Sequence, residues 1–304
     1  LTSITIPASV TSIGSSAFQN ATSLTTVTFE AGSTLASIGI SAFYNASKLK
    51  NITIPDSVTS IGSSAFYSAR SLTSITFGVG SQLATIGNDA FQNASKLKNI
   101  TIPASVTSIG NGAFKFATSL TTVTFEAGST LASFGQYAFQ DATSLTSITI
   151  PNTVTSIGAY AFRSATSLTT VTFENGSLLT TIGANAFQNA TNLTSITIPA
   201  SVTSIGGNAF GITGLTNVIL TQNLTIDLTT YVIGTSGSFF GDSNVSFVPS
   251  TITINTVVYT IIYGTGPFEL LDWTAFGSPV NFMISGFSSV AGSALENQTT
   301  ITNV

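Results

Sequence analysis

The side chains that most often perform catalysis are scarce in this chain. It contains no histidine and no cysteine, which excludes serine–histidine triads, cysteine nucleophiles and the usual zinc sites. The closest acidic pair is Glu269 and Asp272, next to Trp273. Paired carboxylates could serve glycoside chemistry or bind a sugar, but ordinary surface charge explains them more simply. Because phosphate-binding and calcium-binding loop motifs are also missing, we expect no enzymatic activity, no metal and no cofactor.

Threonine forms the most regular polar pattern of the sequence. It recurs at one equivalent position of successive repeats, inside an alternating apolar–polar run that favours a strand. Neighbouring strands lie ~4.8 Å apart, so we expect a row of outward-facing hydroxyl and methyl groups. Three interpretations stay open: threonine simply suits strands, the row is a docking surface for a protein or glycan partner, or it is an ice-binding array. The row consists of Thr5, Thr28, Thr53, Thr76, Thr101, Thr124, Thr149, Thr172 and Thr197.

The surface that this sequence predicts is polar but nearly uncharged. Charged residues make up only 6% of the chain, against about 25% in ordinary soluble domains. Little repulsion then keeps copies apart, so we expect self-association. All seven basic residues lie at or before Arg163 and form no stripe, which argues against nucleic-acid binding. The repeat-borne acids are interpreted as solvated surface charges: Glu30, Glu126 and Glu174.

The elements that would position these residues are repeats. Leucines 48 residues apart each open a nearly identical segment, which reads LTSITIPASVTSIGSSAF in its first copy. Each 48-residue block holds a shorter unit of 23 residues and a longer one of 25, such as LTTVTFEAGSTLASIG from Leu24. A period of this length is typical of a solenoid, in which each unit contacts only its neighbours. No apolar run approaches the ~20 residues of a membrane helix.

Within a unit, the alternation of Ile4, Thr5 and Ile6 predicts a half-buried strand, which Pro7 ends because it cannot donate a ladder hydrogen bond. We expect a short helical turn at Ala17–Phe18 to pack onto the core. The phenylalanine recurs in every unit, which predicts a stacked aromatic spine. Its members are Phe18, Phe43, Phe66, Phe91, Phe114, Phe139, Phe162, Phe187 and Phe210.

The pattern L-x-x-I-x-I-P-x-x-V-x-x-I-G-x-x-A-F resembles the BspA-type leucine-rich repeat of bacterial and protist surface proteins, over about residues 1–220. The resemblance implies a leucine-rich-repeat solenoid with a parallel β-sheet on its concave face and short helical turns on the convex side. It also implies an extracellular or cell-surface location and a role in adhesion or partner binding. After the repeats, residues 221–304 predict a β-rich C-terminal cap or domain.

The first repeat begins on the consensus itself, so its coil is expected to present an unpaired strand edge and bare apolar side chains. Either further residues or another molecule would cover them. The expected assembly edge consists of Leu1, Ile4, Ile6 and Phe18. Sequons just after the predicted turn are candidate glycosylation sites that would decorate one side of the solenoid. They are Asn20, Asn45, Asn93 and Asn189.

These observations favour a non-catalytic extracellular surface protein that assembles head to tail into a filament or surface layer, with itself as partner. The alternative is a monomeric adhesin that binds a host or cell-surface protein or glycan through the concave threonine face. Ice binding is the third hypothesis.

Overall fold

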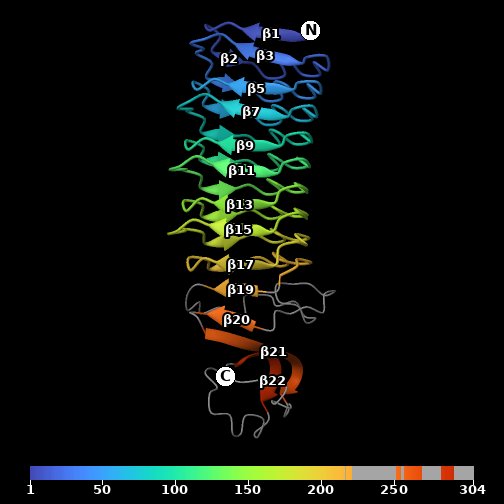
Figure 1. Ribbon diagram of the computed structural model, residues 1–304, viewed down its shortest axis with the longest axis vertical. Helices are drawn as coiled ribbons and strands as arrows, with labels where there is room; N and C mark the ends of the chain where they lie inside the picture. The colour runs from blue at the N-terminus through green and yellow to red at the C-terminus, as the bar shows by residue number, and fades with distance from the viewer. Residues whose placement is uncertain (216, 221–250, 255–256, 269–281, 291–304) are drawn as a thin grey trace.

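The chain forms a column of stacked coils, one coil for each repeat unit (Figure 1). The computed structural model describes residues 1–215 with their side chains, and beyond them the backbone of 217–220, 251–254, 257–268 and 282–290. The column is nearly straight in the view of Figure 1, with the N-terminus at one end. The predicted parallel solenoid is confirmed.

Two parallel sheets run along the column. Sheet A contains the four-residue strands and sheet B the two-residue strands, each in coil order. Sheet A consists of β1 (Ser3–Ile6), β3 (Thr26–Phe29), β5 (Asn51–Ile54), β7 (Ser74–Phe77), β9 (Asn99–Ile102), β11 (Thr122–Phe125), β13 (Ser147–Ile150) and β15 (Thr170–Phe173). Sheet B consists of β2 (Ser12–Ile13), β4 (Ser37–Ile38), β6 (Ser60–Ile61), β8 (Thr85–Ile86), β10 (Ser108–Ile109), β12 (Ser133–Phe134), β14 (Ser156–Ile157), β16 (Thr181–Ile182) and β18 (Ser204–Ile205).

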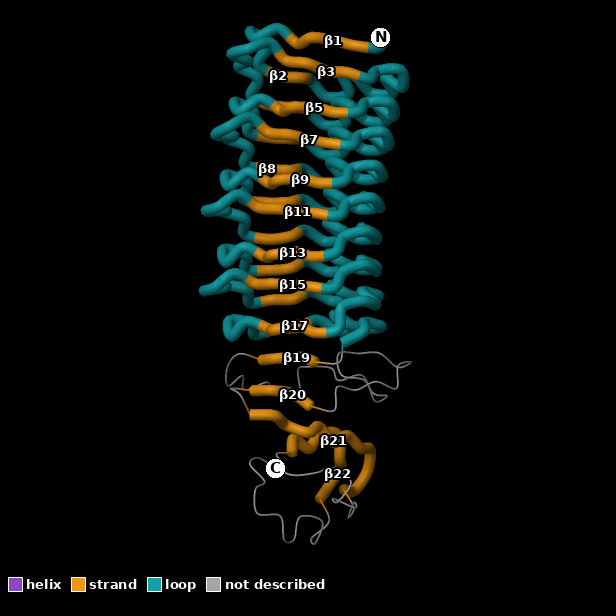
Figure 2. The backbone as a smooth tube through the Cα atoms, in the orientation of Figure 1, coloured by secondary structure: helices purple, strands orange, loops and turns teal. Residues whose placement is uncertain are grey.

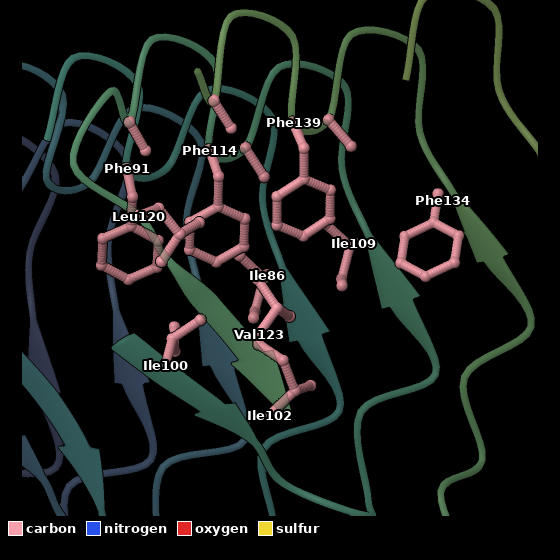
Figure 3. Packing of buried hydrophobic residues seen from close by; sticks show 14 of the residues in the cluster. Ile86, Phe91, Ile100, Ile102, Ile109, Phe114, Leu120, Val123, Phe134 and Phe139 are labelled. Atoms are coloured by element: carbon pink, nitrogen blue, oxygen red, sulfur yellow. The ribbon is translucent and has the colours of Figure 1, made fainter. Parts of the chain in front are cut away.

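The alternation in the sequence sets which side chains each strand buries. In β5, Ile52 and Ile54 are buried while Asn51 and Thr53 are exposed. Sheet B contributes one buried residue per coil, such as Ile61 in β6. The buried side chains of both sheets meet in one continuous core, and Figure 3 shows part of it. Every coil repeats this arrangement because every unit repeats the same apolar spacing.

The predicted phenylalanine spine is confirmed. The nine rings stack in coil order with interplanar angles of 10° or less. Ring centroids are 5.0 Å apart at Phe18–Phe43 and 5.4 Å apart at Phe139–Phe162. Figure 3 shows three of these rings side by side, with the isoleucines of both sheets packed below them. The ring separation follows the coil spacing, so one phenylalanine per unit is enough to build a continuous column.

The predicted short helical turns are wrong. No helix occurs in the part of the chain that the structure describes, and loops connect the strands (Figure 2). Around Phe18, Ser16 and Asn20 have left-handed backbones with φ of 59° and 58°. The intervening Phe18 N–H donates to the Ala42 carbonyl of the next coil at 2.7 Å. Left-handed residues four positions apart interrupt a right-handed helix. The N–H groups of Ser16, Phe18 and Asn20 all donate to the next coil, so these turns form a third hydrogen-bonded ladder along the column.

The sequence did indicate these turns, because residues that tolerate a left-handed backbone recur on both sides of the Ala-Phe pair. Asparagine, aspartate and serine occupy many of these positions, and asparagine and aspartate adopt positive φ more readily than most residues. The Ala-Phe pair between them suggested a helix because it is apolar and compact, but its flanking residues decide the backbone.

Sheet B packs so closely that several coils require glycine after the strand. A Cβ on Gly62 would lie 2.7 Å from the carbonyl carbon of Gly39, and one on Gly135 would lie 2.5 Å from that of Gly110. Side-chain carbons do not approach backbone this closely, so the recurrent Ile-Gly pair keeps the coils in contact.

The last strands form sheet C, with the order β17 (Ser195–Ile198), β19 (Asn217–Leu220), β20 (Thr251–Ile254), β21 (Val257–Phe268) and β22 (Phe282–Val290). β20 pairs in parallel with β19, and β21 then pairs antiparallel with β20. The row of parallel strands therefore continues beyond residue 220, while the domain boundary placed there stays a prediction. Glu269, Asp272 and Trp273 lie outside the described residues.

Candidate functional site: the outer face of sheet A

The nine threonines of the predicted row lie on the outer face of sheet A and of β17, and all are exposed. They alternate with buried residues, as Thr101 does between Ile100 and Ile102. No strand from β1 to β17 in either sheet contains a charged residue. The strands of this face therefore form a long, uncharged, hydroxyl-bearing surface.

The threonine row is divided into pairs. Hydroxyl oxygens lie 2.8 Å apart at Thr5–Thr28 and at Thr53–Thr76, and 2.9 Å apart at Thr101–Thr124. Each pair joins a shorter unit to the longer unit that follows it. The sequence predicted a ladder of hydroxyls, and six of the nine threonines form these three hydroxyl pairs.

The backbone of sheet A shows the same alternation. Junctions from a shorter to the next longer unit, here called closed junctions, pair four residues: β1–β3, β5–β7, β9–β11 and β13–β15. Junctions from a longer to the next shorter unit, here called open junctions, pair only the first residue: β3–β5, β7–β9 and β11–β13. At the fourth open junction, β15 and β17 belong to different sheets.

Proline distinguishes the open junctions from the closed ones. At a closed junction the residue after the longer unit's strand donates its N–H to the preceding coil, as Glu126 does to the Ile102 carbonyl at 3.0 Å. At an open junction the equivalent residue is Pro55, Pro103, Pro151 or Pro199. Proline has no N–H, so this ladder hydrogen bond cannot form where only the first residues of the strands are paired.

Each open junction has one partly exposed phenylalanine. Phe29, Phe77, Phe125 and Phe173 end the longer units' strands, and each is only half-buried against the core. The equivalent residues of the shorter units stay buried, as Ile54 and Ile102 do at 0% exposure. The position in the repeat is the same, while the residue type and the pairing with the next strand both differ.

Two of the open junctions form distinct grooves. The groove between β3 and β5 has a volume of about 470 Å³, and the groove between β15 and β17 has one of about 430 Å³. The first is lined by Thr28, Phe29, Glu30, Thr53, Pro55 and Asp56 among others. The second contains the equivalent residues Thr172, Phe173, Glu174, Thr197 and Pro199. Each groove combines a phenyl ring with hydroxyl groups and a carboxylate.

The glutamates of the longer units are exposed to solvent and also accept hydrogen bonds from the backbone of the preceding coil. The Glu30 carboxylate accepts a hydrogen bond from the Ala8 N–H at 3.0 Å. Glu126 and Glu174 make the same contact with the backbone of the preceding coil at the same distance. These acids hold the turn after the strand across closed junctions, which the interpretation as surface charge had missed. In the β7 coil, Gly78 stands in place of the glutamate.

Among the titratable side chains of the described residues, that of Asp89 has a shifted pKa. Burial raises the pKa of the Asp89 carboxyl, and the nearby Lys115 opposes that shift. Asp89 lies in the third ladder, away from sheet A. Within the described residues, no three potential ligands gather around a metal-sized space, and no helix is long and apolar enough to span a bilayer.

The predicted assembly edge is only partly exposed. Leu1 is 69% exposed and Ile4 and Phe18 are half-buried, while Ile6 belongs to the core at 5%. In the next shorter unit, the residues equivalent to Leu1 and Ile4 are Leu49 and Ile52, which are 0% and 3% exposed. Strand β1 pairs with β3 on one side only. Leu1 and Ile4 are therefore less buried than their equivalents in the next shorter unit.

The four candidate glycosylation asparagines share a left-handed backbone, with φ between 55° and 63°. Asn20 is exposed, and the other three are half-buried. The Asn45 Nδ2 donates to the Asn20 Oδ1 at 3.0 Å, and the Asn93 Nδ2 donates to the Ser68 Oγ at 3.4 Å. Two of the four amide nitrogens therefore have partners within the third ladder.

A family model described as the BspA type leucine rich repeat region matches residues 1–121 and 132–258, with six copies. The chain belongs to this family, and the resemblance seen in the sequence is confirmed. A comparison with curated protein sequences finds no significant match.

Among solved structures, the pneumococcal vaccine antigen PcpA is 22% identical, with a TM-score of 0.51 over 100% of this chain and 80% of PcpA. A leucine-rich cell surface protein of Faecalibacterium prausnitzii is 24% identical, with a TM-score of 0.44 over 100% and 92% of the two chains. A leucine-rich repeat protein of T. pallidum is 23% identical, with a TM-score of 0.45 over 63% and 78%. The likeness to PcpA supports the leucine-rich-repeat fold.

Proposed function

We propose that this chain, as a member of the BspA-type leucine-rich repeat family, is a non-catalytic extracellular surface protein with a structural or adhesive role. The observation that carries the proposal is the outer face of sheet A, which presents exposed threonines along the whole stack without a charged residue in its strands. Such a face offers a long contact area in place of an enclosed catalytic pocket. PcpA, which shares the fold, is described as a vaccine antigen, and a surface location suits that role.

The first form of this proposal is head-to-tail self-assembly. Coil 1 leaves Leu1 exposed and β1 paired on one side only. A strand from the β-rich tail of a second copy would pair with that edge and cover the apolar side chains. Contacts between two different surfaces of one chain produce open filaments when the rotation between copies does not close.

A proline substitution on the free edge of β1 tests this form. The carbonyls of Thr2 and Ile6 accept hydrogen bonds from the coil of β3, so the peptide groups of the alternate residue Thr5 point away from β3. Thr5→Pro removes the outward N–H and should abolish filaments seen by electron microscopy, while Thr5→Val keeps the N–H and should assemble normally. Filaments that persist in Thr5→Pro, or wild-type protein that stays monomeric at high concentration, would overturn head-to-tail assembly.

The second form is a monomeric adhesin that binds a protein or glycan partner through sheet A. Thr101 and Thr124 lie at the centre of the stack and are exposed. Lysine at both positions should block attachment of the labelled protein to glycan-coated and protein-coated surfaces without changing its unfolding midpoint. Unchanged attachment would exclude this face as the binding site. Ice binding predicts thermal hysteresis, which we expect to be absent because the open junctions interrupt the even spacing of the hydroxyls.

A further inference from the structure

The open junctions form a regular series on the outer face of sheet A. Each has a half-buried phenylalanine on one strand and a proline at the end of the next. They recur every second coil, and coils in a parallel sheet are ~4.8 Å apart, so equivalent junctions and their phenylalanines are roughly 10 Å apart. A ligand that contacts several of these phenylalanines must repeat the same group at that interval.

The grooves contain several hydrogen-bond acceptors beside their hydroxyl groups. Pro55 lines the groove between β3 and β5 and has no N–H to offer to the strand that ends at Phe29. The carboxylates of Glu30 and Asp56 add further acceptors to the same groove, and Glu174 lines the groove between β15 and β17. A ligand that fits this lining brings many donors and an apolar surface for the phenyl ring. A sugar ring supplies both, through its hydroxyl groups and its C–H face.

The β15–β17 junction lacks even the single residue pair that joins β3 to β5. In the earlier shorter units, the hydroxyls of Ser57 and Ser105 each donate to two carbonyls of the preceding coil. Thr153 does the same. The equivalent Ser201 hydroxyl is buried and has no hydrogen-bond partner. The absence of that contact agrees with the break in sheet pairing between β15 and β17.

Peptide ligands fit the series less well. An inserted β-strand needs a gap along its whole length, but β3 and β5 remain paired at Thr26 and Asn51. An extended peptide lying along the face repeats its side chains about every 7 Å, out of step with the grooves. A polyproline helix repeats about every 9 Å, which matches the spacing, but proline-rich segments lack the N–H donors that the acceptors require.

We propose that the open junctions are the subsites of a neutral, linear, β-linked polysaccharide that lies along sheet A, with one ring of each disaccharide on a phenylalanine. Such polymers repeat every two sugars, a length similar to the groove spacing. Acidic residues line both grooves, so negatively charged glycans are repelled. This inference names a ligand for the binding form of the proposed function and rests on it.

The test measures binding of cello- and chito-oligosaccharides of two to eight sugars by calorimetry, with heparin and a proline-rich peptide as comparison probes. Once an oligosaccharide spans two open junctions, its affinity should rise by roughly 10²-fold, because the second contact becomes intramolecular. Phe29→Ala with Phe77→Ala should remove that step. The control Tyr44→Ala with Tyr67→Ala removes two stacked rings of the third ladder, outside sheet A, and should keep it.

Three outcomes would overturn the inference: affinity that does not depend on oligosaccharide length, equal binding by the phenylalanine variants, or a preference for heparin or the peptide. Absence of binding to every neutral oligosaccharide would overturn it as well. Surface attachment is measured on the same proteins. If the lysine variants at Thr101 and Thr124 lose attachment while no oligosaccharide binds, the adhesin proposal stands and only the polysaccharide subsites fail.

Discussion

The closed junction β9–β11 and the open junction β11–β13 lie next to each other and use nearly the same residues. At the first, four residue pairs align and the Glu126 N–H completes the ladder. At the second, one pair aligns and Pro151 stands in the donor's position. Residues that follow the same consensus therefore pair along the whole strand at one junction and at a single residue at the next, and the two junctions differ in one backbone N–H. Because closed and open junctions alternate, the pairing of sheet A repeats every two coils, whereas the strands themselves repeat in every coil.

The largest expected effect compares the two classes of phenylalanine. Phe114 is fully buried between two other rings, so Phe114→Ala should lower the free energy of unfolding by about 3–5 kcal/mol. Phe125 is half-buried at an open junction, so Phe125→Ala should have a clearly smaller effect. Urea denaturation of both variants measures the difference, and equal losses would contradict the weaker packing of Phe125 at its open junction.

The second prediction converts a closed junction into an open one. Glu126→Pro removes the N–H that the Ile102 carbonyl accepts at 3.0 Å and should destabilise the protein by about 1–3 kcal/mol. The carboxylate contact to Ala104 is lost as well. Glu126→Ala is therefore the matched control, because it loses the carboxylate but keeps the N–H. Amide hydrogens of β11 that exchange faster in Glu126→Pro than in Glu126→Ala would show that the junction has opened.

The third prediction converts an open junction into a closed one. Pro55→Ala supplies an N–H opposite the Phe29 carbonyl, and the new amide proton at position 55 should then exchange slowly. The free energy of unfolding should change little, because the new hydrogen bond, about 0.5–1.5 kcal/mol, is offset by the loss of proline's restriction of the unfolded chain, about 0.4–1 kcal/mol. An amide at position 55 that exchanges as fast as one in a loop would show that proline is not what keeps the strands apart.

The smallest expected effect concerns the threonine pairs. Thr101→Val removes the hydroxyl that lies 2.9 Å from that of Thr124, yet valine suits an exposed strand position. The change in the free energy of unfolding should stay within about 0.5 kcal/mol, in either direction. A loss well above that value in thermal unfolding would show that the pairs stabilise the closed junctions more than the backbone ladder does.

Much of the fold was predictable because the same apolar spacing recurs in nine units of the sequence. The alternation around Thr5 placed strands and buried faces correctly, and the single phenylalanine per unit predicted the ring column. The predicted helical turn at Ala17–Phe18 failed because local apolarity does not reveal the left-handed backbone at Ser16 and Asn20. That backbone is stabilised by hydrogen bonds to the next coil, such as Phe18 to Ala42, and these contacts are not local in sequence.

The candidate site was predictable in its residues but not in its geometry. Proline was correctly interpreted as the end of each shorter strand, and within the repeats it occurs at the strand ends of the shorter units only. The consequence for the neighbouring coil was missed, because it depends on which carbonyl the absent N–H would have met. The sequence by itself determined the coil, its core and its exposed threonines, since these depend on residue type and spacing. Only the tertiary structure decided at which junctions the strands of sheet A stay paired along their length, because each ladder hydrogen bond joins residues of two neighbouring coils.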